Sequence, residues 1–418
     1  MRFQSPRGTE DVIPTESFKW QRLESTFRDL VTRHGYGEIR TPTFEETALF
    51  TRSAGETSDI VTKEMYTFPD KGGRSMTLKP EGTAGVMRAA IEHNLCPTGT
   101  FARLFYITPV FRYERPQKGR FRESHQVGLE LLGSASPVAD AEVISITFQF
   151  YRAIGLNEVE VSLNSIGRGA CRQAFREAIL KHMGRFLSDQ PQEFRDRAEK
   201  NPLRILDSKD PAVQNALQGI APITTFLEPD SRERFDRLQD LLTKEAVPFR
   251  LAPEIVRGLD YYTDTVFEIV SSRLGSQNAL CGGGRYDDLM KELGGSSTPS
   301  VGVGMGIERA LLVLEEARIK SEAPRPDLFI VSATPEASEP CRRIASELRG
   351  LGYSVVTDPD ERSLRGQLRQ ADRVFARRAL ILGSDELAKG TVQIRDLDSA
   401  QQEEIPVDTV AAWLKDRG

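Results

Sequence analysis

Glycine occupies every second position from Gly302 to Gly306, three residues before an apolar run at 310–314. Because glycine has no side chain, this alternation lets another group approach the backbone closely. The apolar run predicts a buried helix with Arg309 in its first turn. The spacing G-x-G-x-G differs from the dinucleotide-binding G-x-G-x-x-G, and the chain contains no G-x-x-x-x-G-K-[ST]. If this chain binds a nucleotide, arginine side chains must therefore hold the phosphates.

A second stretch sets an arginine close to two adjacent phenols. It reads RGLDYYTDTVFE and runs from Arg257 to Glu268. An arginine beside a glycine puts a cation close to bare backbone, which suits a phosphate ligand. If Tyr261 and Tyr262 belong to a strand, they should face opposite surfaces, and one hydroxyl group could bind a polar ligand. A tyrosine-rich strand beside a solvated arginine would account equally well for this stretch alone.

Residues 111–126 predict a β-hairpin with a long cationic tip, because two apolar stretches flank a basic loop broken by proline and glycine. Arg112 falls in the first strand, while Gln126 and Glu130 share one face of the second. Such a face suits a small zwitterion bound together with an anion. A surface hairpin with a solvated charged tip is the ordinary alternative.

A turn at residues 80–83 joins a short predicted strand at 75–79 to a predicted helix that begins at residue 84. Glu81 in this turn could accept hydrogen bonds from a ligand ammonium group. Thr83 is the predicted N-cap of the helix.

These segments together resemble class II aminoacyl-tRNA synthetases, and most closely the histidyl-tRNA synthetases. The hairpin FRYERPQKGRFRESHQ is similar to the second motif of that class, and GVGMGIERALLVL is similar to the third. RGLDYYTDTVFE and CGGGRYDDL are similar to two stretches peculiar to the histidyl enzymes. RGTEDV, LKPEGT and NPLRILDSK are further matches in the order of the family, so the resemblance covers nearly the whole chain.

The resemblance implies an α+β fold, in which helices flank a class II antiparallel sheet. The order of predicted strands and helices agrees with this fold class. It implies a catalytic domain at 1–320 with a helical insertion at about 171–250, and an anticodon-binding domain at 326–418. The last region alternates strand and helix, which predicts a small three-layer α/β domain. In the family a helix–strand pair like the one near residues 20–42 builds a dimer interface, so we expect a homodimer.

The resemblance also implies roles for individual residues. Arg257 and Arg112 would be catalytic, on either side of the α-phosphate of ATP. L-Histidine would contact Glu81, Thr83, Arg112, Gln126, Glu130, Arg257, Tyr261 and Tyr262. ATP, accompanied by Mg²⁺, would contact Arg112, Arg120 and Arg309. The acceptor end of tRNA would contact Arg115, Gln117 and Arg122.

Arginines at 362, 365, 369 and 373 are spaced to share one face of a predicted helix in the C-terminal region. Arg365 and Arg369 are the predicted tRNA contacts of this series, because guanidinium groups pair with phosphates and stack on splayed bases. A solvated basic face is the alternative.

Composition sets further limits. The 418 residues suffice for two to three domains, and the net charge of −5 means that RNA binding must rest on local basic patches. Neither the four scattered cysteines nor the four histidines have the spacing of a metal site, and the cysteines show no disulfide framework. Without an apolar signal core or a long apolar run, the sequence predicts a cytoplasmic protein without membrane contact.

The predicted function is to activate L-histidine with ATP as histidyl-adenylate and to transfer histidine to the 3′ end of its tRNA, releasing AMP and pyrophosphate. Two other classes of protein fit part of the pattern. One is a histidine-sensing paralogue, similar to the regulatory subunit of ATP phosphoribosyltransferase, that charges no tRNA. The other is an RNA scaffold with a silent site. The presence of Arg112, Arg257 and Arg309, together with the C-terminal α/β region, favours the enzyme.

Overall fold

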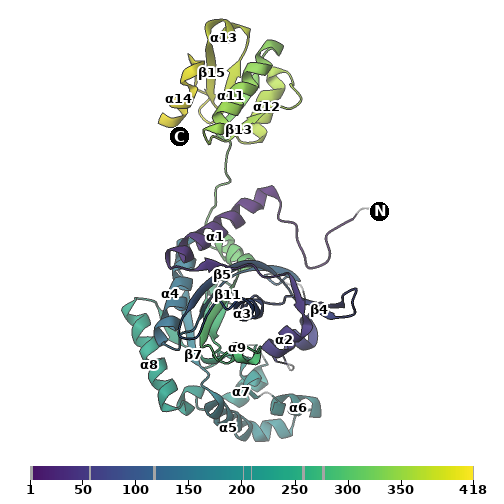
Figure 1. Cartoon of the computed structure of the whole chain (residues 1–418), viewed down its shortest axis with the longest axis vertical. Coiled ribbons are helices and arrows are strands. Elements are labelled where there is room, and N and C mark those ends of the chain that lie inside the picture. The colour runs from purple at the N-terminus through teal and green to yellow at the C-terminus, as the bar shows by residue number, and fades with distance from the viewer. Residues whose placement is uncertain are drawn as a thin grey trace. The chain divides into compact units, whose positions relative to one another are not determined.

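The computed structural model divides the chain into two compact units, residues 1–321 and 322–418, which we describe separately (Figure 1). The described residues are 3–55, 58–115, 119–200, 202–208, 210–256, 259–274 and 278–417.

An eight-stranded sheet forms the centre of the first unit. Six antiparallel strands in the order β5-β6-β11-β10-β9-β7 carry a parallel strand at each edge, β1 beside β5 and β8 beside β7. The antiparallel sheet predicted from the sequence is confirmed, and the two parallel edge strands are additions to it. The bounds are β1 Gly37–Glu38, β5 Ala102–Phe111, β6 Glu123–Leu132, β7 Glu160–Ser165, β8 Phe249–Leu251, β9 Thr263–Val270, β10 Ala279–Arg285 and β11 Ser300–Gly306.

Three helices, α1 (Pro14–Arg33), α4 (Pro137–Ala153) and α10 (Ile307–Glu316), contact one another or the central strands. Helix α1 buries apolar side chains three or four residues apart, and Phe27 among them packs edge-on against Phe105 and Phe150. This contact joins α1 and α4 to β5, so the helices form a layer over the sheet.

A small sheet and short helices lie next to the β5-β6 hairpin. The sheet has the order β2-β4-β3. The bounds are β2 Phe44–Glu46, β3 Thr67–Pro69, β4 Ser75–Leu78, α2 Thr47–Ala54, a π-helical turn Ile60–Glu64, α3 Thr83–Glu92 and α9 Leu289–Glu292.

The predicted capping of α3 by Thr83 is wrong. The helix begins at Thr83 itself, with Gly82 in the N-cap position, and the Thr83 hydroxyl group donates to Glu130. The carboxylate of Glu81 instead accepts the backbone N–H groups of Thr83 at 2.6 Å and Ala84 at 2.7 Å. An ionised acceptor at a helix N-terminus makes stronger hydrogen bonds than a hydroxyl group, which explains the exchange of roles.

The helical insertion predicted in the fold leaves the sheet after β7 and returns in β8. Its helices are α5 Gly169–Ser188, α6 Gln192–Lys200, α7 Pro211–Leu217 and α8 Pro229–Lys244, with short 3₁₀ turns at Pro202–Asp207 and Ile223–Phe226. Helix α5 buries Cys171, Phe175, Ile179, Met183 and Leu187, each four residues from the next, so one face of α5 packs inward.

The second unit is a three-layer α/β domain, as predicted. Alternation in β12 sends Leu328 and Ile330 into one apolar cluster, and Phe329 and Val331 into another, so both faces of the sheet are covered. The sheet has the order β13-β12-β14-β15-β16. The bounds are β12 Leu328–Ser332, α11 Ser338–Gly350, β13 Val355–Thr357, α12 Leu364–Arg373, β14 Arg378–Leu382, α13 Ser384–Lys389, β15 Thr391–Asp396, β16 Gln402–Pro406 and α14 Val410–Asp416.

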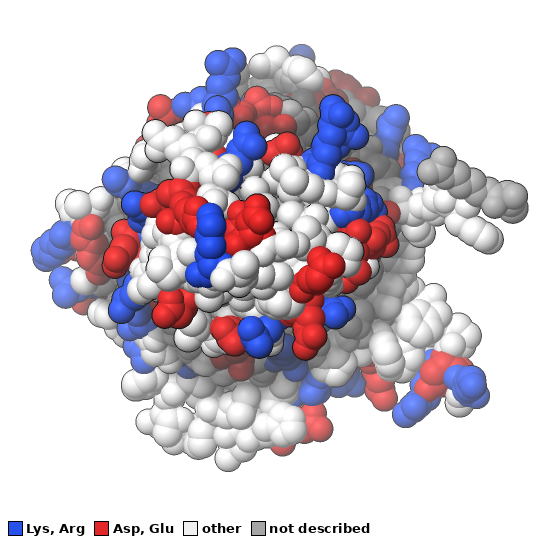
Figure 2. All heavy atoms as spheres, turned by 90° about the horizontal axis from the view of Figure 1, so that it is seen from above, with Lys and Arg blue, Asp and Glu red and all other residues white. Residues whose placement is uncertain are grey.

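Acidic and basic side chains are interspersed over the face displayed in Figure 2. In the part of the chain that the structure describes, no helix has the length and apolar character needed to cross a bilayer. All four cysteines are buried free thiols.

Candidate active site

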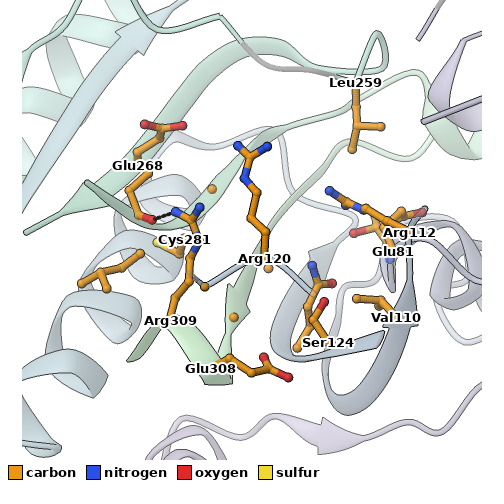
Figure 3. Close-up of a pocket in the computed structure, with 18 of the residues that line it drawn as sticks. Glu81, Val110, Arg112, Arg120, Ser124, Leu259, Glu268, Cys281, Glu308 and Arg309 are labelled. Atoms are coloured by element: carbon orange, nitrogen blue, oxygen red, sulfur yellow. Dashed lines mark hydrogen bonds between the residues drawn. The ribbon is translucent and has the colours of Figure 1, made fainter. Parts of the chain in front are cut away.

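A cavity of about 340 Å³ lies in the first unit, where the β5-β6 hairpin, β10, β11 and the first turn of α10 meet. It gathers segments that are far apart in the sequence. The predicted site residues that line it are Glu81, Thr83, Arg112, Arg120, Gln126, Tyr261, Tyr262 and Arg309. Figure 3 shows Arg309 and Glu268 on one side of the cavity, Arg112 and Glu81 on the opposite side, and Arg120 between them.

A hydrogen-bonded chain runs through the acidic end of the cavity. Glu81 is bound to the N-terminus of α3, and the Thr83 hydroxyl group donates to Glu130 Oε1 at 2.7 Å. Burial raises the pKa of Glu81, and the backbone N–H groups of Ala84 and Thr83 oppose that rise. A bound ammonium group would favour the ionised carboxylate, so this end suits a cation.

Glu130 lies beneath the cavity, fully buried, and is not among the residues that line it. Its second oxygen accepts the Tyr286 hydroxyl group. Burial raises the pKa of Glu130 to about 8, while the hydroxyl groups of Tyr286 and Thr83 hold it down. Both carboxylate oxygens already have donors, so a ligand must share Glu130 with Thr83 or Tyr286.

Tyr261 and Tyr262 line the same cavity, and both are 5 % exposed. Their ring centroids are 4.6 Å apart, and Tyr261 also packs edge-on against Tyr286 at 5.5 Å. The prediction that the two tyrosines face opposite surfaces is wrong. Both precede β9, which begins at Thr263, so the alternation of a strand does not govern their directions.

The opposite end of the cavity is cationic. Arg309 donates from Nη1 to the carbonyl oxygen of Ala279 at 2.5 Å, and an Arg120 nitrogen lies 3.2 Å from Glu114. Burial, followed by the charge of Arg120, lowers the pKa of Arg309. A polyanion placed between the two guanidinium groups would relieve their repulsion, so this end suits phosphates.

Arg112 belongs to the Glu81 side, where its Nε donates to the carbonyl oxygen of Pro80 at 2.8 Å. Its guanidinium group is therefore fixed next to the carboxylate that would hold an ammonium group. Gln126, on β6, lines the same cavity. Glu81, which can bind a cationic group, and Arg112, which can bind an anionic group, thus lie close enough to bind the two ends of one zwitterion.

Not all of the predicted site residues are found at the cavity. Two of them, Arg257 and Gln117, fall outside the described residues, so the structure does not place them. Arg115 is exposed, and the half-buried Arg122 stacks its guanidinium group 3.9 Å from the ring centroid of Tyr113. Neither Arg115 nor Arg122 lines the cavity.

In the second unit Arg365 and Arg369 are exposed on α12. The predicted arginine face is shorter than expected, because Arg362 precedes the helix. Arg362 instead binds Asp358, at 3.0 Å, and Asp360.

The sequence interpretation assigned no role to Tyr286, Glu268 or Glu308. Glu268 and Glu308 line the cavity, and Tyr286 supports Glu130 from below. A signal existed for Glu268, since it is the single charged residue in the run TVFEIV. Tyr286 lies in the CGGGRYDDL motif, but its partner is 156 residues away in the sequence.

Comparisons with known proteins agree with this geometry. A family model described as histidyl-tRNA synthetase matches residues 8–310, and one described as an anticodon-binding domain matches residues 327–417. A histidine–tRNA ligase of Moorella thermoacetica is 46% identical over 98% of this chain and 97% of its own length. One from Synechocystis is 46% identical over 96% of this chain and 89% of its own length.

Solved structures show the same fold. Apo histidyl-tRNA synthetase of S. aureus aligns with a TM-score of 0.84 and 34% identity, covering 99% of this chain and 100% of the other. A Bacillus halodurans chain described as an ATP phosphoribosyltransferase regulatory subunit/histidyl-tRNA synthetase has a TM-score of 0.65 at 22% identity, covering 92% of this chain and 99% of its own, which shows a shared fold alone. On its fold, its two-ended cavity and its relatives, the chain belongs to the histidyl-tRNA synthetase family.

Proposed function

We propose that this chain is a histidine–tRNA ligase that joins L-histidine to the 3′ end of its tRNA in two steps, consuming ATP and releasing pyrophosphate and AMP. The observation that best supports this proposal is one cavity with a carboxylate–tyrosine end and a guanidinium end. The first end suits an amino acid with a polar ring, and the second suits a polyphosphate.

In the first step, a carboxylate oxygen of histidine forms a bond to the α-phosphorus of ATP. The bond from that phosphorus to the bridging oxygen breaks, and its electrons leave with pyrophosphate. The attacking carboxylate is already ionised at neutral pH, so this step needs positioning and charge neutralisation rather than a general base. Arg112 and Arg257 would stabilise the charge on the α-phosphate, and Arg309 and Arg120 would hold the outer phosphates.

Histidine would be selected by both its ends. Glu81, Thr83 and Gln126 would bind its ammonium group. Glu130 and Tyr262 would meet the two ring nitrogens, with Tyr261 beside them. An amino acid without ring nitrogens could not make these hydrogen bonds, so it should bind more weakly than histidine.

ATP is the nucleotide of this family, and Mg²⁺ is proposed to accompany it. Among the described residues no three His, Cys, Asp or Glu side chains gather as metal ligands. Mg²⁺ commonly keeps several waters and binds through phosphate oxygens with one or two carboxylates. Glu268, which faces the phosphate end of the cavity in Figure 3, fits that need. When bound, the ion neutralises phosphate charge.

In the second step a ribose hydroxyl group at the tRNA end attacks the carbonyl carbon of the adenylate, and AMP leaves. Arg115, Gln117 and Arg122 are proposed to contact the acceptor end. Residues 1–320 would thus form the catalytic domain, and 326–418 the anticodon-binding domain.

Within 326–418, Arg365 and Arg369 are proposed to contact the tRNA. Their exposure on α12 supports this proposal. A cavity of about 110 Å³ in the same unit, lined by Arg342, Asp358 and Gln367 among others, offers polar groups for a base.

A cytoplasmic homodimer is proposed for the working form. The free thiols of the cysteines fit a reducing compartment. The small sheet exposes Phe44 and Phe68, whose rings pack edge-on at 6.2 Å, and such an apolar pair suits an interface. Light scattering coupled to gel filtration should give twice the monomer mass, whereas a monomer mass at micromolar protein would reject the dimer.

The test of function is aminoacylation. Purified protein, ATP, Mg²⁺ and total tRNA should attach labelled histidine to tRNA, and labelled proline or threonine should not be attached. If another amino acid is attached instead, histidine is not the substrate and the proposed specificity is wrong. Histidine binding without charging of cognate tRNA would instead support the regulatory paralogue.

A further inference from the structure

The helical insertion is tied to the central sheet by a set of ion pairs around Arg168, the residue directly before α5. Its Nε donates to Asp264 Oδ2 at 2.6 Å, and its Nη2 donates to Asp287 Oδ2 at 2.6 Å. Both carboxylates are buried, at 4 % and 8 % exposed, and neither lines the cavity. One planar guanidinium group therefore bridges the start of β9 and the turn after β10, in the fork geometry that arginine provides.

The two bridged carboxylates stand next to the tyrosines of the candidate site. Asp264 is two residues after Tyr262, and Asp287 directly follows Tyr286. Arg172, one turn along α5, also donates from Nη1 to the carbonyl oxygen of Tyr262 at 3.1 Å. The first turn of the insertion thus contacts the supports of both tyrosine segments.

Asp264 has an unusual backbone. Its φ of 47° lies in the left-handed region, which residues other than glycine adopt uncommonly, although Asp does so more readily than most. The pairing of β9 with β10 shifts register here, between the pairs Gly284–Val266 and Arg285–Thr263, and such bulges redirect the neighbouring side chains. The conformation at Asp264 therefore sets the direction in which the chain leaves Tyr262.

This strained conformation is held mainly by the insertion and its entry. Ser231, on α8, donates its hydroxyl group to Asp264 Oδ1 at 2.7 Å, while Arg168 occupies the other oxygen. The backbone N–H of Asp264 donates to Gly167 at 3.0 Å. Strain of this kind persists where surrounding contacts over-determine it, and here those contacts come from α5 and α8.

Asp287 is fixed mainly to the sheet, and Arg234 of α8 also lies 4.0 Å from its Oδ2. Its Oδ1 accepts from Arg285 Nη1 at 3.0 Å and from the backbone N–H of Ser300 at 3.2 Å. Arg285, 1 % exposed, is itself paired with the buried Asp140. Arg168 therefore connects a rigid anchor below Tyr286 to a strained turn after Tyr262.

We propose that Arg168 is a positioning residue for the proposed reaction: its bridge couples the helical insertion to the histidine-binding tyrosines and so sets the affinity for histidine, although Arg168 touches no substrate. This inference rests on the proposed function, since it takes the tyrosine end of the cavity as the histidine site. We expect the guanidinium end, formed by Arg120 and Arg309, to be independent of the bridge.

The experiment is steady-state ATP–pyrophosphate exchange on the full chain, with histidine and ATP varied separately. Arg168→Gln should raise the KM for histidine roughly tenfold and leave the KM for ATP within about twofold, as expected for loss of one coupling element. Arg168→Lys keeps the charge but cannot reach both carboxylates as a fork. Its KM for histidine should therefore lie between those of wild type and Arg168→Gln. Arg185→Gln, an exposed arginine on the same helix, is the matched control and should behave as wild type.

Ser231→Ala is a milder second variant, because it removes one donor to Asp264 and leaves both charges in place. It should raise the histidine KM in the same direction by a smaller factor. Arg168 has a side chain that is 42% exposed, so its replacement should leave no core cavity, and circular dichroism melting checks the fold.

Equal rises in the two KM values, or a fall in kcat alone, would reject the positioning role, as would wild-type behaviour in Arg168→Gln. If Arg168→Gln fails to fold, the test rests on Ser231→Ala. An unchanged KM for histidine in that variant would also reject the positioning role. Failure of wild-type protein to show histidine-dependent exchange would instead reject the proposed function.

Discussion

At the scale of residues, the candidate site depends on one buried hydrogen-bonded chain. Glu81 is held by the N-terminus of α3, Thr83 links it to Glu130, and Tyr286 closes the chain from the other side. Burial, and after it the charge of Glu81, raises the pKa of Glu130, so ionising both carboxyl groups together is unfavourable. A cationic ligand would favour the ionised forms, which makes the acidic end selective by charge.

Thr83→Val should weaken histidine binding and leave ATP binding nearly unchanged. Valine has the shape of threonine but leaves Glu130 Oε1 without its donor, and an unpaired buried acceptor typically costs about 1–3 kcal/mol. Isothermal titration calorimetry with each ligand measures the effect. Thr32→Val, on the exposed face of α1, is the control. Equal weakening for both ligands would contradict a role at the histidine end.

Glu130→Gln should flatten the pH dependence of stability. The pKa of Glu130 is about 8 in the folded chain against an ordinary 4.5, so the folded state holds a proton that the unfolded state releases. The stability from this proton is present below about pH 4.5 and is lost as the pH rises through about 8. Urea unfolding between about pH 5 and pH 8 should therefore show a steeper loss for wild type than for the variant. Parallel curves would show that Glu130 is ionised throughout this range.

At the scale of elements, strand β11 explains the alternating glycines. A Cβ atom at Gly302 would lie 1.7 Å from Glu130 Oε2 and 2.6 Å from the Tyr286 hydroxyl oxygen. Gly304 and Gly306 line the cavity itself. The glycine face of β11 thus makes room for Glu130 and for ligand, as the alternation predicted.

Gly302→Ala should displace Glu130 and cost most of the histidine affinity. The contact is with a carboxylate whose partners are both fixed, so overpacking here should also lower stability, by about 1–3 kcal/mol. Equilibrium histidine binding and urea unfolding measure the two effects. At Gly184, within α5, an added Cβ meets nothing within 4 Å, so Gly184→Ala is the control and should not weaken binding. Normal histidine affinity in Gly302→Ala would mean that Glu130 is dispensable.

Local patterns predicted the elements well, because alternation and helical spacing reflect burial on one face. The shared face of Gln126 and Glu130 is an example, since both oppose glycines of β11 in the register of the sheet. Patterns failed where the backbone leaves regular structure. The loop before β9 turned Tyr261 and Tyr262 to the same cavity, and the longer side chain of Glu81 took the capping role.

Long-range partners were beyond any local pattern. Tyr286 and Glu130 meet through sheet pairing across 156 residues, and Arg168 meets Asp287 across 119. Nothing in the neighbourhood of either residue in sequence marks such a pair. The resemblance to a family predicted roles for the pocket residues. The residues that hold them in place could be identified only from the three-dimensional fold.

At the scale of the whole molecule, chemistry and RNA recognition are proposed to belong to different units. The cavity with its carboxylates and guanidinium groups is built wholly from the first unit, whereas the arginines of α12 belong to the second. Amino acid activation needs no RNA, so damage to α12 should affect the second step alone.

The double variant Arg365→Gln/Arg369→Gln should raise the KM for tRNA in aminoacylation and leave pyrophosphate exchange unchanged. Losing two phosphate contacts should weaken tRNA binding and reduce its salt dependence by about two charges. Filter binding at several salt concentrations measures this. Arg343→Gln/Lys415→Gln removes the same charge from exposed positions of α11 and α14 and is the control. If both double variants lose the same tRNA affinity, α12 contributes only its positive charge and makes no specific contact.

The central claim is that fixed guanidinium groups activate histidine beside a carboxylate–tyrosine pocket, and ATP–pyrophosphate exchange tests it most directly. Wild-type protein should exchange label when histidine is present and not with any other amino acid, and Arg112→Gln should lower that rate about 100- to 1,000-fold, as expected for loss of one preorganised donor. An exchange rate that does not depend on histidine, or that is unchanged in Arg112→Gln, would contradict the account.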